Sequence, residues 1–299
     1  MTDSISHIPR FLARNGWSLR RLWLVIIVFC VAVGLTLRAW ETIWYTAIYY
    51  HNALYILLVP PISVWLFYVR RYRIRFCTPY RIWVGFLLLV IGLFTFECGR
   101  YLKIETLDMA GSLIFVLGGI VSVLGVSLIR YFLSAIVVYL FIIPVPYPIE
   151  NLISEPLQIA VFDVTHVVYN WFDIGLHREG EVIVNTSGQL IQLTGSGRIM
   201  GMLMTYILMA YAFAFGLPLR SGIRAVVILV SPFIAVVTIV IQSIALTWLY
   251  DYYDPMWVHS VIRNVAWCSL IISIAAYYLV IRILIWTAVP VMRFTVPKN

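Results

Sequence analysis

The chain has 299 residues, of which 63% are hydrophobic and only 11% charged, and its mean hydropathy is +0.96. Soluble globular proteins are roughly 45–50% apolar and about 25% charged, so these values exclude a soluble globular domain, a disordered chain and a disulfide scaffold. The formal net charge of +8 is typical of basic cytoplasmic loops in a membrane protein rather than of nucleic-acid binding. We therefore expect a polytopic all-α membrane protein that contacts the lipid bilayer and binds no nucleic acid.

Apolar stretches of about 20 residues can cross a bilayer as helices, because a helix satisfies its own backbone hydrogen bonds. The sequence predicts eight such spans. They are residues 22–37, 52–69, 82–98, 109–129, 131–147, 199–217, 225–249 and 265–281. Residues 109–149 are about twice the length of one bilayer crossing and contain a single charge, Arg130. We therefore predict two spans joined by a tight turn near Arg130.

The basic residues predict an orientation. Most of the 21 Lys and Arg residues fall on the side of the N-terminus in this eight-span arrangement, and they include the cluster at residues 70–75. Positive charge is enriched in cytoplasmic loops. We therefore predict a multi-pass protein of the cytoplasmic (inner) membrane with both termini in the cytoplasm. The cluster at residues 70–75 is expected to contact anionic headgroups.

Residues 150–198 form the longest segment predicted outside the spans, on the extracytoplasmic face. Their first part, residues 150–174, mixes apolar residues with acids and a histidine, which favours an interfacial or re-entrant helix over a full span. Residues 181–185 and 189–193 then flank Thr186-Ser187-Gly188, which predicts a β-hairpin. We expect one membrane domain over residues 1–299, with residues 150–198 as an extracytoplasmic insertion.

Polar residues near the outer ends of the late spans are candidates for chemistry. Ser196, Gln242 and His259 all fall there and could meet near the headgroup level, although isolated polar groups at span ends are usually interface residues. The four cysteines have no paired spacing and give no metal or disulfide signature. We expect neither a metal nor a cofactor.

Four short motifs occur in order along the chain. They are Tyr50-His51-Asn52-Ala53-Leu54, Ile142-Ile143-Pro144-Val145-Pro146, Glu155-Pro156-Leu157-Gln158 and Arg178-Glu179-Gly180-Glu181-Val182-Ile183. In order and spacing they resemble the exosortase/archaeosortase family of membrane transpeptidases, over roughly residues 45–275. The resemblance implies recognition of secreted proteins that end in a short motif, a hydrophobic helix and a basic tail. It also implies a Cys nucleophile, a His that exchanges protons with it, and an Arg that stabilises the oxyanion.

Two of these three catalytic residues are replaced. In the resemblance, Gly195 stands at the position of the cysteine, Ala245 at the position of the arginine, and His259 at the position of the histidine. Glycine carries no nucleophile and alanine no charge. The resemblance therefore implies a degenerate member, which binds the sorting helix of secreted proteins or assists exopolysaccharide export without cutting.

Two other hypotheses remain open. Ser196 is adjacent to Gly195 and could act with His259 as a nucleophile and base, with Arg198 replacing the missing cation and nearby glycines exposing backbone N–H donors. An unrelated transporter or scaffold is the third hypothesis, which the absence of paired intramembrane charges in the early spans disfavours. The residues expected to contact a substrate are Arg178, Glu179, Arg198 and Gln242.

Overall fold

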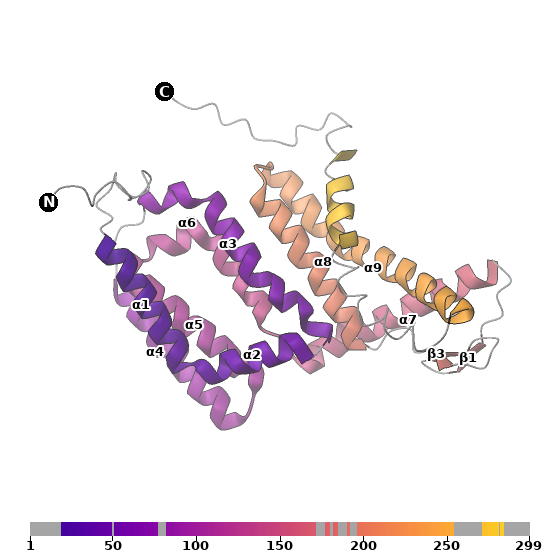
Figure 1. Ribbon diagram of the computed structural model, residues 1–299, viewed down its shortest axis with the longest axis horizontal. Helices are drawn as coiled ribbons and strands as arrows, with labels where there is room; N and C mark the ends of the chain where they lie inside the picture. Colours follow the sequence, from indigo (N-terminus) through magenta and orange to yellow (C-terminus); the bar gives the residue numbers. More distant parts are fainter. Residues whose placement is uncertain are drawn as a thin grey trace. The chain divides into compact units, whose positions relative to one another are not determined.

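The computed structural model describes residues 19–49, 51–76, 82–171, 177–179, 182–184, 190–191, 196–253, 271–280 and 282–283. The chain forms two compact units. The first comprises Met1–Thr46 and Ile56–Pro144, and the second comprises Ala47–Tyr55 and Val145–Asn299. The described part of each unit is dominated by helices (Figure 1).

The elements of the first unit are α1 (Leu19–Leu35), most of α2 (Leu37–Tyr49), α3 (Val59–Val69), η3 (Arg71–Phe76), α4 (Ile82–Leu102), α5 (Glu105–Leu124), α6 (Ser127–Val137) and η4 (Val138–Ile142). The 3-10 segment η2 (His51–Leu58) is divided between the units. Those of the second unit are α7 (Tyr147–Trp171), β1 (His177–Glu179), β2 (Val182–Val184), β3 (Leu190–Ile191), α8 (Ser196–Gly216), α9 (Ser221–Tyr252) and a helix at residues 271–280.

Helices α4 and α5 form an antiparallel pair whose backbones are in contact (Figure 1). Glycines recur every seven residues on the facing sides, at Gly85, Gly92 and Gly99 of α4 and at Gly111 and Gly118 of α5. A Cβ on Gly92 would lie 2.4 Å from the backbone nitrogen of Phe115, closer than real Cβ atoms approach any neighbour. Small residues let membrane helices pack at this range, where dispersion replaces the missing hydrophobic driving force. The glycines therefore determine the register of this pair.

Apolar contacts join the other helices of the first unit to this pair. Buried residues of α1 and α5 form one cluster, and buried residues of α5 and α6 form another. The Phe132 ring of α6 stacks on the Phe67 ring of α3, with 4.4 Å between centroids. The buried hydroxyl of Ser63 donates a hydrogen bond to the Ala135 carbonyl oxygen at 3.2 Å. These contacts attach α3 to α6 through both packing and a polar link.

The break between the two helices lies at Gly125, five residues before the Arg130 near which the turn was predicted, and Arg130 lies within α6, two residues before a kink at Phe132. Gly125 has φ 82° and ψ 167°, and its N–H donates to the Val121 carbonyl at 2.8 Å. Only glycine adopts this backbone conformation readily, so Gly125 ends α5. The predicted spans 109–129 and 131–147 are replaced by α5 and by α6 followed by η4.

The described residues contain four helices long and apolar enough to cross a membrane, namely Trp83–Leu102, Glu105–Leu124, Ile199–Gly216 and Ser221–Ala245. Two interrupted pairs would raise the number to six if each counts as one span, namely Trp23–Leu35 with Leu37–Tyr49, and Ser127–Ile142 with Tyr147–Val168. The count of eight is therefore not confirmed. The helix Tyr55–Val69 is shorter than a full span, and most of the predicted span 265–281 lies outside the described residues.

The three strands pair antiparallel in the order β1-β2-β3. Arg178 of β1 lies opposite Ile183 of β2, and Ile183 lies opposite Ile191 of β3. Strands β2 and β3 fall within the two segments predicted to form a hairpin, but the turn between them lies outside the described residues, so the hairpin stays a prediction. Helix α7 covers most of residues 150–174, and its interfacial placement likewise stays a prediction.

Candidate functional site

The antiparallel pair α8 and α9 positions the candidate residues of the second unit. Ile239 of α9 packs with Ile199 and Met202 of α8 and with Val161 of α7 in one buried cluster. Four residues separate the end of α8 from the start of α9, so the second half of α9 returns alongside the start of α8. This cluster, together with the short connection, gives the approximate register of the two helices.

This register brings Gln242 to the level of Ser196. Gln242 lies three residues beyond Ile239 on α9, and Ser196 lies three residues before Ile199 on α8. In antiparallel helices both steps run in the same direction along the axis, each by about 4.5 Å. By this axial-rise estimate, Gln242 and the first turn of α8, which begins at Ser196 and includes Arg198, fall at a similar height along the pair.

Gln242 is buried, with 9% of its surface exposed. Neither its side-chain oxygen nor its side-chain nitrogen has a hydrogen-bond partner among the described residues. A buried amide left in this way costs about 1–3 kcal/mol for each unsatisfied group. A side chain left in this way is a candidate for a functional role, since buried polar groups in native proteins are generally hydrogen-bonded.

Two buried threonines of α8 and α9 bond within their own helices. Thr238, one turn earlier on α9, donates to the Ile234 carbonyl at 2.8 Å, and Thr205 of α8 donates to the Gly201 carbonyl at 2.8 Å. These hydroxyls bond within their own helices, as serine and threonine often do. The longer Gln242 amide has no such bond in the described part of the second unit, and neither does the buried Tyr206 hydroxyl, so Gln242 differs from the two threonines in having both polar atoms without a described partner.

The structure describes the other predicted site residues only in part. Arg178 and Glu179 lie on β1, and Ser196 and Arg198 lie in the first turn of α8, with only their backbones described. Ala245 is exposed on α9. His259 and Gly195 lie outside the described residues, so the pairing of Ser196 with His259 stays a prediction.

A buried tyrosine pair, which the sequence analysis missed, attaches the helix at residues 271–280 to α8. The hydroxyl of Tyr277 donates to the Tyr206 carbonyl at 2.9 Å, and the two ring centroids are 6.5 Å apart. Both residues are fully buried. The apolar periodicity of these segments gave no sign of the contact, because tyrosine at a span end is as common in an interfacial belt as in a helix contact.

The apolar helices and the buried Gln242 of α9 define a polytopic α-helical membrane protein with a candidate site inside the second unit. A family model described as "Transmembrane exosortase" matches residues 40–279. The chain belongs to the transmembrane exosortase family, which confirms the resemblance drawn from its motifs. The matched region includes α8, α9 and the helix at residues 271–280. No curated protein and no solved structure matches the chain.

Proposed function

We propose that this exosortase-family protein binds the C-terminal hydrophobic sorting helix of secreted proteins and does not cut them. The observation that carries this proposal is the buried amide of Gln242 in α9, whose polar atoms have no hydrogen-bond partner among the described residues. A primary amide offers both a donor and an acceptor, which match the C=O and N–H of a peptide group. Gln242 therefore suits a client peptide that enters the second unit and pairs with it.

The sequence supports binding without cleavage. Gly195 and Ala245 stand where the family resemblance expects a thiol and a guanidinium, so neither the nucleophile nor the oxyanion-stabilising cation is present at those positions. Arg220 and Arg224 lie near the opposite end of α9, and Arg224 sits over the Phe215 ring at 5.6 Å. From Arg224 to Gln242 is about 27 Å along the helix, so these arginines do not replace the missing cation.

The rest of the assignment follows from the same proposal. The protein would lie in the cytoplasmic membrane with both termini in the cytoplasm and the start of α8 at the extracytoplasmic face, where secreted clients arrive. The protein would take part in protein sorting or in exopolysaccharide export. Membership of the transmembrane exosortase family argues against an unrelated transporter or scaffold. Single-cysteine labelling from each side of the membrane tests the orientation.

Client capture tests the binding role. The probe is a secreted reporter that ends in a short polar motif, an apolar helix of about 20 residues and a basic tail. It is co-expressed with the full chain and co-purified from membranes in mild detergent. We expect the wild type to retain the intact reporter and Gln242→Leu to retain about tenfold less, as for one lost buried hydrogen-bonding group. Ile241→Leu, on the exposed neighbour, is the matched control and should retain the reporter normally.

The mass of the captured reporter tests the absence of cleavage. An active serine enzyme is the second candidate, favoured by the position of Ser196 at the level of Gln242. Cleavage by the wild type that is lost in Ser196→Ala and in His259→Ala would establish that enzyme and contradict the non-cleaving proposal. Failure of the wild type to capture the reporter at all would contradict the binding role.

A further inference from the structure

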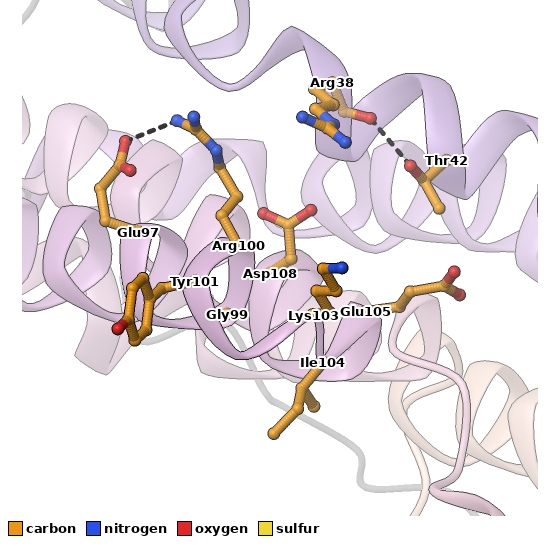
Figure 2. Close-up of a pocket in the computed structure, with 10 residues that line it drawn as sticks. All are labelled: Arg38, Thr42, Glu97, Gly99, Arg100, Tyr101, Lys103, Ile104, Glu105 and Asp108. Carbon is orange, nitrogen blue, oxygen red and sulfur yellow. Dashed lines mark hydrogen bonds and ion pairs between the residues drawn. The ribbon is translucent and has the colours of Figure 1, made fainter.

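A charged cavity of about 420 Å³ lies in the first unit, where the turn between α4 and α5 meets the start of α2 (Figure 2). Its lining includes three basic and three acidic residues, Arg38, Arg100, Lys103, Glu97, Glu105 and Asp108. The apolar stretches of α4 and α5 both end at this turn. The cavity therefore lies where apolar helix gives way to charged residues, at the depth of the lipid headgroups if α4 and α5 cross the membrane.

The close packing of α4 against α5 builds the floor of this cavity. Lys103 adopts φ 56° in a two-residue turn, and the N–H of Ile104 donates to the Gly99 carbonyl at 2.9 Å. Because Gly99 has no side chain, the backbone of Asp108 lies against it. The cavity volume is within the usual range for small-ligand sites, about 300–1,000 Å³.

Most of the charged side chains in the cavity form no direct ion pair among the described residues. Arg100 forms an ion pair with Glu97 at 2.9 Å. The other basic and acidic lining side chains, Arg38, Lys103, Glu105 and Asp108, form no ion pair with any described residue. Figure 2 shows the Asp108 carboxylate directed toward the side of the cavity formed by Arg38. These two cationic and two anionic side chains all line the cavity and balance in number, although Figure 2 shows Glu105 directed away from Asp108.

The carboxylate of Asp108 also specifies what kind of cation would fit. Its Oδ1 is shielded from solvent and has no hydrogen-bond donor among the described residues. A primary ammonium supplies N–H donors to such an oxygen, whereas a quaternary ammonium has none. Arg38 and Lys103 are the complementary groups for a phosphate. A ligand that carries both a phosphate and a primary ammonium would satisfy both sets of charges.

We propose that this cavity binds the headgroup of a zwitterionic phospholipid with a primary amine, in which the phosphate contacts Arg38 and Lys103 and the ammonium contacts Asp108. Phosphatidylethanolamine has this chemistry. Phosphatidylcholine lacks the N–H donors, and phosphatidylglycerol lacks the cation. This site lies wholly within the first unit, so it does not rest on the client-binding role proposed for the second.

Lipid retention tests the site on the full chain. The protein is reconstituted in nanodiscs with equal amounts of the three phospholipids, extracted in mild detergent, and its co-purifying lipids are measured by mass spectrometry. The wild type should retain phosphatidylethanolamine over phosphatidylcholine by about tenfold, as expected for a charge-assisted hydrogen bond. Asp108→Asn should abolish this preference, whereas Arg38→Gln and Lys103→Gln should lower retention of both lipids.

Matched controls separate the site from general charge effects. Glu41→Gln and Arg73→Gln replace exposed charges outside the cavity and should leave retention unchanged. Lys103 is exposed, so Lys103→Gln should fold normally. This variant therefore still tests the site if Asp108→Asn is unstable. Soluble glycerophosphoethanolamine added as competitor distinguishes a free headgroup from an intact lipid as the ligand. Equal retention of the two lipids by the wild type, or an unchanged preference in a folded Asp108→Asn protein, would overturn the proposal.

Discussion

Gly99 and Asp108 are in backbone contact, because a Cβ on Gly99 would lie 2.4 Å from the Asp108 nitrogen. The contact is the last of the series that begins with Gly85 against Ser122 and continues with Gly92 against Phe115. It places the Asp108 carboxylate at the edge of the charged cavity. The packing of α4 against α5 and the geometry of the cavity therefore depend on the same glycines.

Gly92→Ala should destabilise the protein by about 1–3 kcal/mol, because the added methyl group would force α4 and α5 apart near Phe115. Gly34→Ala is the control, since a Cβ at Gly34 of α1 meets nothing within 4 Å. Thermal unfolding of both variants in one detergent provides the comparison. Equal unfolding temperatures for the two variants would show that the glycine register is not required.

Gly125→Ala should also destabilise the protein, by about 1–3 kcal/mol, because alanine is strained at φ 82°. The strain should loosen the junction between α5 and α6. Gly222→Ala, at an open position near the start of α9, is the control. Denaturant or thermal unfolding measures the difference, and an alanine at position 125 that unfolds like the wild type would contradict the assignment of Gly125 as the helix break.

Gln242→Leu should raise the free energy of unfolding by about 1–3 kcal/mol even as it weakens client capture. Leucine is close to glutamine in size and removes the two polar atoms that have no described partner. Thermal unfolding without client measures the gain, with Ile241→Leu as the exposed control. A loss of stability would mean that the amide is satisfied in the folded protein and would remove the main support for its binding role.

Tyr277→Phe should lower stability by about 0.5–1.5 kcal/mol, because it removes the hydrogen bond to the Tyr206 carbonyl while keeping the ring. Tyr278→Phe, at the exposed neighbouring position, should have little effect. Limited proteolysis near residues 271–280 should show earlier cleavage of the Tyr277 variant. Identical stability of the two variants would show that the hydroxyl does not hold this helix against α8.

The sequence alone predicted the membrane class, the family and the main apolar helices. Hydropathy depends only on neighbouring residues, and the family motifs are short stretches of sequence, so neither requires the tertiary structure. The resemblance also predicts that Gly195 and Ala245 stand at the positions of the family's cysteine and arginine. The sequence misplaced the break between α5 and α6. Arg130 was the only charge in a long apolar stretch, but the backbone conformation of Gly125 decides where that stretch divides.

Only the tertiary structure showed that Gln242 is buried without a described partner and that Arg38, Lys103 and Asp108 face one cavity. Both properties depend on which segments pack together, and those segments are distant in the chain. The sequence gives the identity of a polar side chain, but it does not show whether its donors and acceptors have hydrogen-bond partners. These partners are determined by helix register, here by the glycines of α4 and α5 and by the contact of Ile239 with Ile199.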